Sequence, residues 1–126
     1  MTILVVDDSK IMRNIVKKHF DVLGYKCDYI EADNGMTALQ LLRSHPVQLV
    51  LLDWNMPQLS GLDFLKTVRA MPQYAELPIV MVTSESARYN MVEALKNGAT
   101  DYIIKPINEK NFKDKISKID FSKAGK

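Results

Sequence analysis

The chain has 126 residues, of which 47% are apolar and 25% charged, a composition typical of one globular domain with a single core. The net charge of +2 is too small to favour nucleic acid binding, and no apolar run reaches the roughly 20 residues that span a bilayer. The single cysteine, Cys27, excludes an internal disulfide and a sulfur-based metal site, so we expect a reducing, cytoplasmic location.

The first half of the chain alternates aliphatic runs with stretches of helical periodicity. It predicts a strand at 3–6, a helix at 9–23, a less apolar edge strand at 27–32 and a short helix over 38–42. Gly24 is expected to end the first helix, and Asn34-Gly35 is expected to turn the chain before the second. The first strand ends abruptly at the acidic pair Asp7-Asp8.

The second half continues the alternation. It predicts strands at 48–53, 78–82 and 101–104, and helices at 61–71, 86–97 and after residue 108. Ser60 and Asn108 are expected helix caps, and Val92 and Leu95 are expected to face the core. We expect a single domain over 1–126 with a frayed tail at 122–126. Seven lysines against three acids from residue 105 onward make its end basic, which is the pattern of a solvated face.

Five strands alternating with five helices imply a parallel sheet that is covered by helices on both faces. In such sheets ligands bind beyond the carboxyl ends of the strands. The unusual polar residues of this chain all stand at such ends, namely Asp7, Asp8, Asp53, Thr83 and Lys105. We therefore expect the functional site at this edge of the sheet.

Three carboxylates, those of Asp7, Asp8 and Asp53, converge if the first and third strands are neighbours. Two carboxylates ~4 Å apart at an effective dielectric of about 20 repel each other by about 4 kcal/mol. The cluster therefore needs a cation, and an all-oxygen site suits Mg²⁺ or Mn²⁺. Lys105 would balance the remaining charge or pair with an incoming anion, and Thr83 offers a hydroxyl. We infer a phosphate-binding arrangement with Asp53 as the nucleophile.

The set formed by Asp7-Asp8, Asp53, Thr83 and Lys105 resembles the pattern of response-regulator receiver domains, over essentially the whole chain. The likeness is greatest to the single-domain chemotaxis regulators, and it is carried by Trp54, Asn55, Met56, Pro57, Gly61, Thr83-Ser84-Glu85 and Tyr102. The resemblance implies a doubly wound (βα)5 flavodoxin-like three-layer sandwich with a parallel sheet in the order 2-1-3-4-5. It also implies a monomeric, stand-alone response regulator of a two-component phosphorelay that is not a turnover enzyme.

The resemblance assigns a role to each residue of the site. Asp53 is the implied acceptor of a phosphoryl group from a histidine kinase, in a transfer that depends on Mg²⁺. The side chains of Asp8 and Asp53 and the backbone carbonyl of Asn55 are the implied metal ligands, and Asp7 is implied to act through water. Lys105 is implied to contact the phosphate.

The resemblance also implies a switch. Thr83 would move toward the phosphoryl group and Tyr102 would turn inward behind it, which changes the face formed by the helix at 86–97, the strand at 101–104 and the last helix. The peptide between Lys105 and Pro106 is implied to be cis. The implied partners are an output protein such as a flagellar switch protein, and a phosphatase.

Alternatives to this interpretation stay open. Thr83-Ser84 also fits a helix cap, and Tyr102 also fits a core position. Ser84 stands where the chemotaxis members usually have alanine, which bears on access to the phosphate, and Asn55 suggests a short-lived acyl phosphate. The chain could instead pass phosphate to a histidine phosphotransfer protein. An aspartyl-phosphate phosphatase of the haloacid dehalogenase type needs an acid where this chain has Asn55, and a flavodoxin-like cofactor binder needs a glycine-rich loop after the first strand, which is absent.

Overall fold

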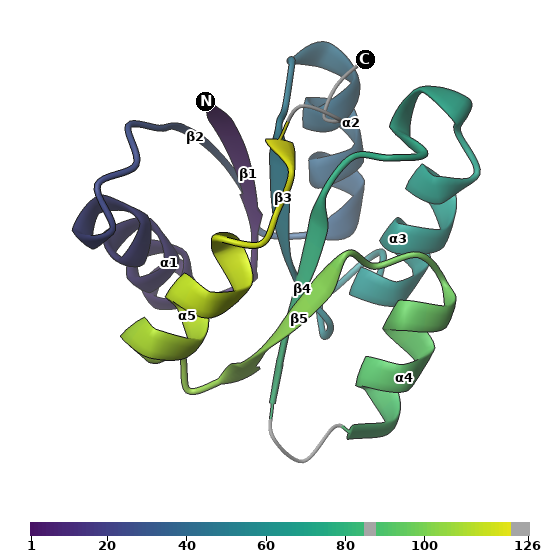
Figure 1. The fold of residues 1–126 in the computed structure, drawn as a ribbon. Helices are drawn as coiled ribbons and strands as arrows, with labels where there is room; N and C mark the ends of the chain where they lie inside the picture. Colours follow the sequence, from purple (N-terminus) through teal and green to yellow (C-terminus); the bar gives the residue numbers. More distant parts are fainter. Residues whose placement is uncertain (85–87, 122–126) are drawn as a thin grey trace.

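The computed structural model describes residues 1–84 and 88–121 and shows a five-stranded sheet between two layers of helices (Figure 1). The strands are β1 (Thr2–Val6), β2 (Asp28–Ala32), β3 (Leu49–Asp53), β4 (Ile79–Ser84) and β5 (Asp101–Lys105). They are all parallel and lie in the order β2-β1-β3-β4-β5, which confirms the predicted fold and places β2 at an edge.

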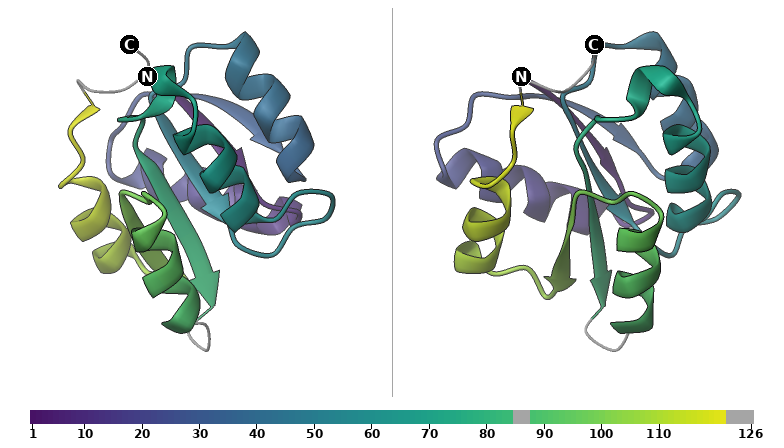
Figure 2. Two further views of the ribbon diagram at one scale, coloured as in Figure 1. Left: turned by 90° about the vertical axis from the view of Figure 1, so that its right-hand side faces the viewer. Right: turned by 45° about the vertical axis from the view of Figure 1, so that its right-hand side comes forward.

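In the described residues four α-helices connect the strands, a fifth follows β5, and a short 3-10 helix follows the third. They are α1 (Lys10–Val22), α2 (Gly35–Ser44), α3 (Gly61–Arg69), η1 (Pro72–Tyr74), α4 (Arg88–Lys96) and α5 (Glu109–Ile116). α1 and α5 cover one face of the sheet, and α2, α3 and α4 cover the other (Figure 2). Ser60 and Asn108 cap α3 and α5 through their side chains, as predicted. None of the described helices has the length and apolar composition needed to cross a bilayer.

The central strand β3 is buried along its whole length. Its side chains alternate between two separate hydrophobic cores. Val50 and Leu52 pack into the core under α2, α3 and α4, whereas Leu49 and Leu51 pack into the core under α1 and α5. Because both faces are packed, β3 delivers Asp53 to its carboxyl end on a tightly held backbone.

The second helix begins earlier than predicted, and Asn34-Gly35 opens this helix instead of forming a turn. The Asn34 side chain accepts the backbone N–H of Thr37 at 2.8 Å and caps α2. Gly35 is the first helical residue, and a Cβ at this position would collide with the backbone of Leu59. The glycine is therefore required by a tertiary contact between α2 and the loop after β3, which local sequence patterns do not reveal.

The prediction that Val92 and Leu95 face the core is wrong. These side chains are 52% and 47% exposed, whereas Ala94 is fully buried. α4 packs on the sheet through this small side chain, and Val92 and Leu95 lie on the side of the helix that faces solvent. The predicted start of this helix at 86, together with Glu85 and the predicted tail at 122–126, lies outside the described residues.

An ion-pair cluster joins α1 to the edge strand β2. Glu31 accepts hydrogen bonds from Arg13 Nε at 2.9 Å and from Lys17 Nζ at 3.0 Å. The hydrogen bond from Lys17 lowers the pKa of Glu31 below its ordinary value, and the bond from Arg13 adds to this effect, against the opposing effect of burial. The deprotonated form of Glu31 therefore stabilises the folded chain.

Replacing Glu31 by Gln should lower the free energy of unfolding at neutral pH, and this difference should disappear in acid. The pKa of Glu31 is lower in the folded chain than its unfolded value of about 4.3. The stabilisation that Glu31 gives the folded chain is therefore complete above this unfolded value and is lost as the pH falls through the folded pKa. Urea unfolding of both proteins from about pH 7 to about pH 3 measures the difference. Glu76→Gln, in the exposed turn before β4, is the control and should show no such loss. A Glu31→Gln difference that stays constant across this range would contradict the account.

Candidate functional site

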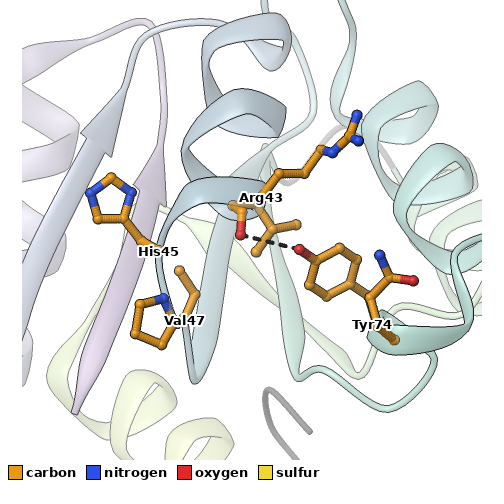
Figure 3. A pocket seen from close by; sticks show the side chains of 7 residues that line it. Arg43, His45, Val47 and Tyr74 are labelled. Atoms are coloured by element: carbon orange, nitrogen blue, oxygen red, sulfur yellow. Dashed lines mark hydrogen bonds between the residues drawn. The ribbon is translucent and has the colours of Figure 1, made fainter.

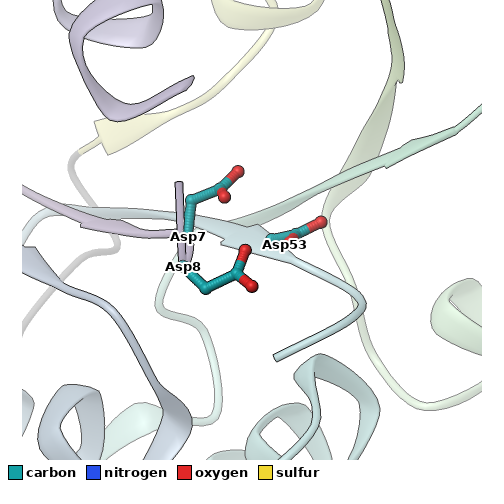
Figure 4. A group of neighbouring side chains, drawn as sticks. All are labelled: Asp7, Asp8 and Asp53. Carbon is teal, nitrogen blue, oxygen red and sulfur yellow. The ribbon is translucent and has the colours of Figure 1, made fainter. Parts of the chain in front are cut away.

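Three carboxylates meet at the carboxyl ends of β1 and β3 (Figure 4). β1 and β3 are paired neighbours, so Asp7 and Asp8, which follow β1, lie beside Asp53, which closes β3. One carboxylate oxygen from each residue lies within 4.8 Å of those of the other two. Asp7 and Asp53 are only 5% and 6% exposed, whereas Asp8 is open to solvent. The convergence expected from the sequence is therefore present.

Lys105, at the end of β5, brings a cation to two of these carboxylates. Its Nζ lies 3.2 Å from Asp53 Oδ1 and 3.4 Å from Asp7 Oδ2. Burial by itself lowers the pKa of Lys105, but Asp53 and Asp7 more than offset this, so the pKa of the ammonium is raised. Burial, followed by the charge of Asp7, raises the pKa of Asp53, and the opposing effect of Lys105 does not offset these two causes. The site thus holds more negative charge than its lysine compensates.

The residues present fit a divalent metal. The Asp7 side chain accepts the backbone N–H of Ser9 at 2.9 Å as well as a hydrogen bond from Lys105. The Asp8 side chain accepts no hydrogen bond from residues 1–84 or 88–121, and its solvent-exposed carboxylate lies beside the buried carboxylate of Asp53. An all-oxygen cluster with access for water matches the preferences of Mg²⁺ and Mn²⁺. The site could hold such an ion mainly through Asp8 and Asp53.

Three other predicted site residues, Thr83, Asn55 and Tyr102, form no hydrogen bond with the three carboxylates within residues 1–84 and 88–121. Thr83 is buried near the end of β4, one residue after Val82, which pairs with Asp53. Asn55 is exposed in the loop after β3, and Tyr102 is half-buried on β5. The peptide between Lys105 and Pro106 is cis. The metal ligation by the Asn55 carbonyl and the switch roles of Thr83 and Tyr102 stay predictions.

The loop after Asp53 is closed by the start of α3. The backbone N–H of Gly61 donates to the Trp54 carbonyl oxygen at 2.9 Å. A Cβ at Gly61 would collide with the carbonyl oxygen of Asp53 and with Cα of Trp54. α3 therefore packs directly against the backbone that carries the central carboxylate, and only glycine permits this approach.

Sequence reasoning missed one residue that contacts the site. Arg13, in the first turn of α1, donates from Nη1 to the backbone carbonyl oxygen of Asp7 at 2.6 Å. No motif marks this contact, because it depends on how α1 lies against β1 and β2. An arginine six residues after an acid, in a helix expected to lie over the sheet, is the only signal that the sequence offers.

The cavities do not all lie at this edge. One of about 220 Å³ lies at the amino end of β3, where the Tyr74 hydroxyl donates to the Leu42 carbonyl oxygen at 3.2 Å (Figure 3). A cavity of about 280 Å³ adjoins Lys105 and Pro106, and another of about 220 Å³ adjoins Arg13. The cavities beside Lys105 and Arg13 flank the carboxylate cluster, whereas the cavity in Figure 3 lies at the opposite end of the strand from Asp53.

Comparisons with known proteins agree with the geometry. The sequence profile of the response regulator receiver domain matches residues 3–117. The chain is 41% identical over 120 residues to a chemotaxis protein CheY homolog from Campylobacter jejuni, covering 94% of this chain and 92% of that protein. It is 43% identical over 117 residues to chemotaxis protein CheY1 from Helicobacter pylori, covering 92% and 94%. The solved structure of chemotaxis response regulator CheY4 of Vibrio cholerae matches with a TM-score of 0.79 at 30% identity, covering 92% and 95%.

Replacing Asp53 by Asn should raise the thermal stability of the metal-free protein. Because the pKa of Asp53 is raised in the folded chain, its ionisation at neutral pH opposes folding, and the neutral amide removes that cost. Melting in the presence of a chelator should show an increase of about 2–6 °C, which corresponds to roughly 1 kcal/mol. Asp63→Asn, on the exposed surface of α3, is the control and should not raise the melting temperature. An unchanged or lower value for Asp53→Asn would mean that Lys105 fully compensates the carboxylate.

Proposed function

This chain belongs to the response regulator receiver domain family, and we propose that it is a phosphorylation-switched signalling module without a turnover activity of its own. Its similarity to chemotaxis proteins of the CheY type places it in two-component signalling. Asp53 is the proposed phosphoryl acceptor, and a histidine kinase is the proposed donor. The observation that carries the proposal is the convergence of Asp7, Asp8 and Asp53 with Lys105 at one edge of the sheet.

Phosphoryl transfer to Asp53 is the proposed chemical step. A carboxylate oxygen of Asp53 attacks the phosphorus of a phosphohistidine, the P–N bond breaks, and its electron pair stays with the imidazole nitrogen, which takes up a proton. When bound, Mg²⁺ or Mn²⁺ would neutralise negative charge on the phosphoryl group during its transfer. Its proposed ligands are Asp8, Asp53 and the backbone carbonyl of Asn55. Asp7, which is already hydrogen-bonded to Lys105, is proposed to contribute through water.

Lys105 is the second cation of the proposed step. Its raised pKa keeps the ammonium charged at neutral pH, and it lies within 3.4 Å of both buried carboxylates. After transfer it is proposed to contact the phosphoryl oxygens, which carry more charge than the carboxylate they replace. Thr83, buried at the end of β4, is proposed to donate its hydroxyl to the same group.

The proposed output surface is formed by α4, β5 and α5. On α4, Tyr89, Val92 and Leu95 are exposed by 74%, 52% and 47%, and their spacing of three residues makes an apolar stripe. On the neighbouring strand, Tyr102 is half-buried, and Lys115 Nζ of α5 lies 4.4 Å from its ring centroid. We propose that Tyr102 turns inward when the phosphoryl group forms, and that the altered surface then binds an output protein.

Because the Campylobacter jejuni and Helicobacter pylori relatives are chemotaxis proteins, we propose a flagellar switch protein as the output partner in the cytoplasm and a phosphatase as a further partner. A phosphate shuttle to a histidine phosphotransfer protein would use the same site chemistry. A Mg²⁺-dependent aspartyl-phosphate phosphatase is disfavoured, because Asn55 occupies the position of the general acid that such enzymes need two residues after the nucleophile.

Acetyl phosphate with Mg²⁺ should add about 80 Da, one phosphoryl group, to the wild-type protein and nothing to Asp53→Asn. The amide of the variant is not a nucleophile, and of the two neighbouring carboxylates Asp7 is hydrogen-bonded to Ser9 and Lys105 while Asp8 is a proposed ligand of the metal. Intact mass spectrometry measures the gain, and a chelator should abolish it. Asp63→Asn is the matched control and should be modified like the wild type. A persistent gain on Asp53→Asn would show that another residue is the main acceptor.

Beryllofluoride, a stable mimic of the phosphoryl group, should create affinity for a peptide of a flagellar switch protein. If the apolar stripe of α4 makes the contact, Val92→Ser should weaken this affinity by roughly 1 kcal/mol or more. Val22→Ser, which changes an equally exposed valine on α1, should leave it unchanged. Titration calorimetry measures both. No gain with beryllofluoride would exclude the motility version of the proposal and leave the shuttle.

A further inference from the structure

Arg13 links the acidic end of β1 to the edge strand β2. Its Nη1 donates to the Asp7 carbonyl oxygen at 2.6 Å, and its Nε donates to Glu31 Oε1 at 2.9 Å. The Arg13 side chain is 14% exposed and that of Glu31 is 35% exposed, so the contact with Asp7 is partly buried whereas the contact with Glu31 lies at the surface. Glu31 is held in turn by Lys17 at 3.0 Å. The guanidinium therefore joins an acceptor just after β1 to an acceptor on β2.

Asp7 is hydrogen-bonded on all sides, whereas Asp8 is not. The Asp7 N–H donates to the Ala32 carbonyl oxygen at 3.1 Å, and its carboxylate accepts from Ser9 and Lys105. The remaining polar group of Asp7 is its backbone carbonyl, and Arg13 takes it. The Asp8 side chain has no hydrogen bond within residues 1–84 and 88–121. Arg13 holds the carbonyl oxygen of the planar Asp7–Asp8 peptide. The orientation of this peptide determines where the Asp8 side chain starts from the backbone.

We propose that Arg13 is a positioning residue for divalent cation binding. It fixes the Asp7–Asp8 peptide so that the exposed Asp8 carboxylate stands beside Asp53, and through Glu31 it links this geometry to β2. The inference rests on the proposed function of the carboxylate cluster as a Mg²⁺ site. Groups that orient metal ligands in this way commonly change metal affinity by a factor of about 10 to 100 when they are removed.

The sign of the effect separates positioning from simple electrostatics. Arg13 carries a positive charge close to the metal-binding carboxylates, so its charge by itself repels a divalent cation. Removing that charge would therefore tighten Mg²⁺ binding if electrostatics alone mattered. Positioning predicts the opposite, namely weaker binding. It also predicts that lysine does not substitute, because one ammonium cannot reach both acceptors with the fixed fork of a guanidinium.

The test is a Mg²⁺ titration of the unphosphorylated full chain, followed by the fluorescence of Trp54, the single tryptophan, which adjoins Asp53. Calorimetry provides a second measurement. Arg13→Lys and Arg13→Gln should each raise the dissociation constant for Mg²⁺ by about tenfold. Lys17→Gln removes the other ion pair of Glu31 without touching the Asp7 carbonyl, and it should change this constant by less than about twofold.

Wild-type affinity in Arg13→Lys, or unchanged or tighter binding in Arg13→Gln, would overturn the inference and leave the proposed function intact. An equal loss in Lys17→Gln would also overturn it, because the effect would then belong to the ion-pair cluster. A wild-type chain that binds no Mg²⁺ would overturn the proposed function together with the inference. Circular dichroism and urea unfolding check that each variant is folded, and the milder Arg13→Lys keeps the test decisive if Arg13→Gln fails to fold.

Discussion

The mutual repulsion of three carboxylates at one edge of the sheet is the interaction on which the rest of the site depends. The fold places Asp7, Asp8 and Asp53 with oxygens within 4.8 Å of one another and buries two of the three side chains. At that distance each pair repels by about 3–4 kcal/mol at an effective dielectric of roughly 20. Lys105 compensates part of this charge. The remaining negative charge suits the cluster to a divalent metal ion, as proposed above.

The proposed switch needs carboxylates that are held in place and an output surface that can change. β3 is buried throughout, α3 packs against the Asp53 backbone through Gly61, and Arg13 holds the Asp7 carbonyl. These contacts fix the carboxylates while their charge changes. α4, in contrast, rests on the sheet through the small Ala94 and leaves its larger apolar residues in solvent. This exposed apolar surface is in keeping with the proposed role of α4 in binding an output protein.

Much of this was predictable because parallel strands leave a regular trace in the sequence. Aliphatic runs that each end on a polar residue predicted both the sheet and the edge at which Asp7, Asp8, Asp53 and Lys105 meet. The pattern failed where tertiary packing decides. The sequence did not distinguish the buried side of α4 from its exposed side, because apolar residues at helical spacing occur on both sides of this helix. The roles of Gly35 and Arg13 depend on contacts with distant segments, for which no local signal exists.

The central claim, that the carboxylate cluster is completed by one divalent cation, is tested most directly by locating that cation. Crystals of the unphosphorylated protein grown with Mn²⁺, measured for anomalous scattering, would reveal its position. The account predicts one strong peak at the carboxyl ends of β1 and β3, ligated by Asp8, Asp53 and the backbone carbonyl of Asn55, with Lys105 still beside Asp7. Mn²⁺ bound elsewhere, or no peak at this edge despite millimolar metal, would contradict it.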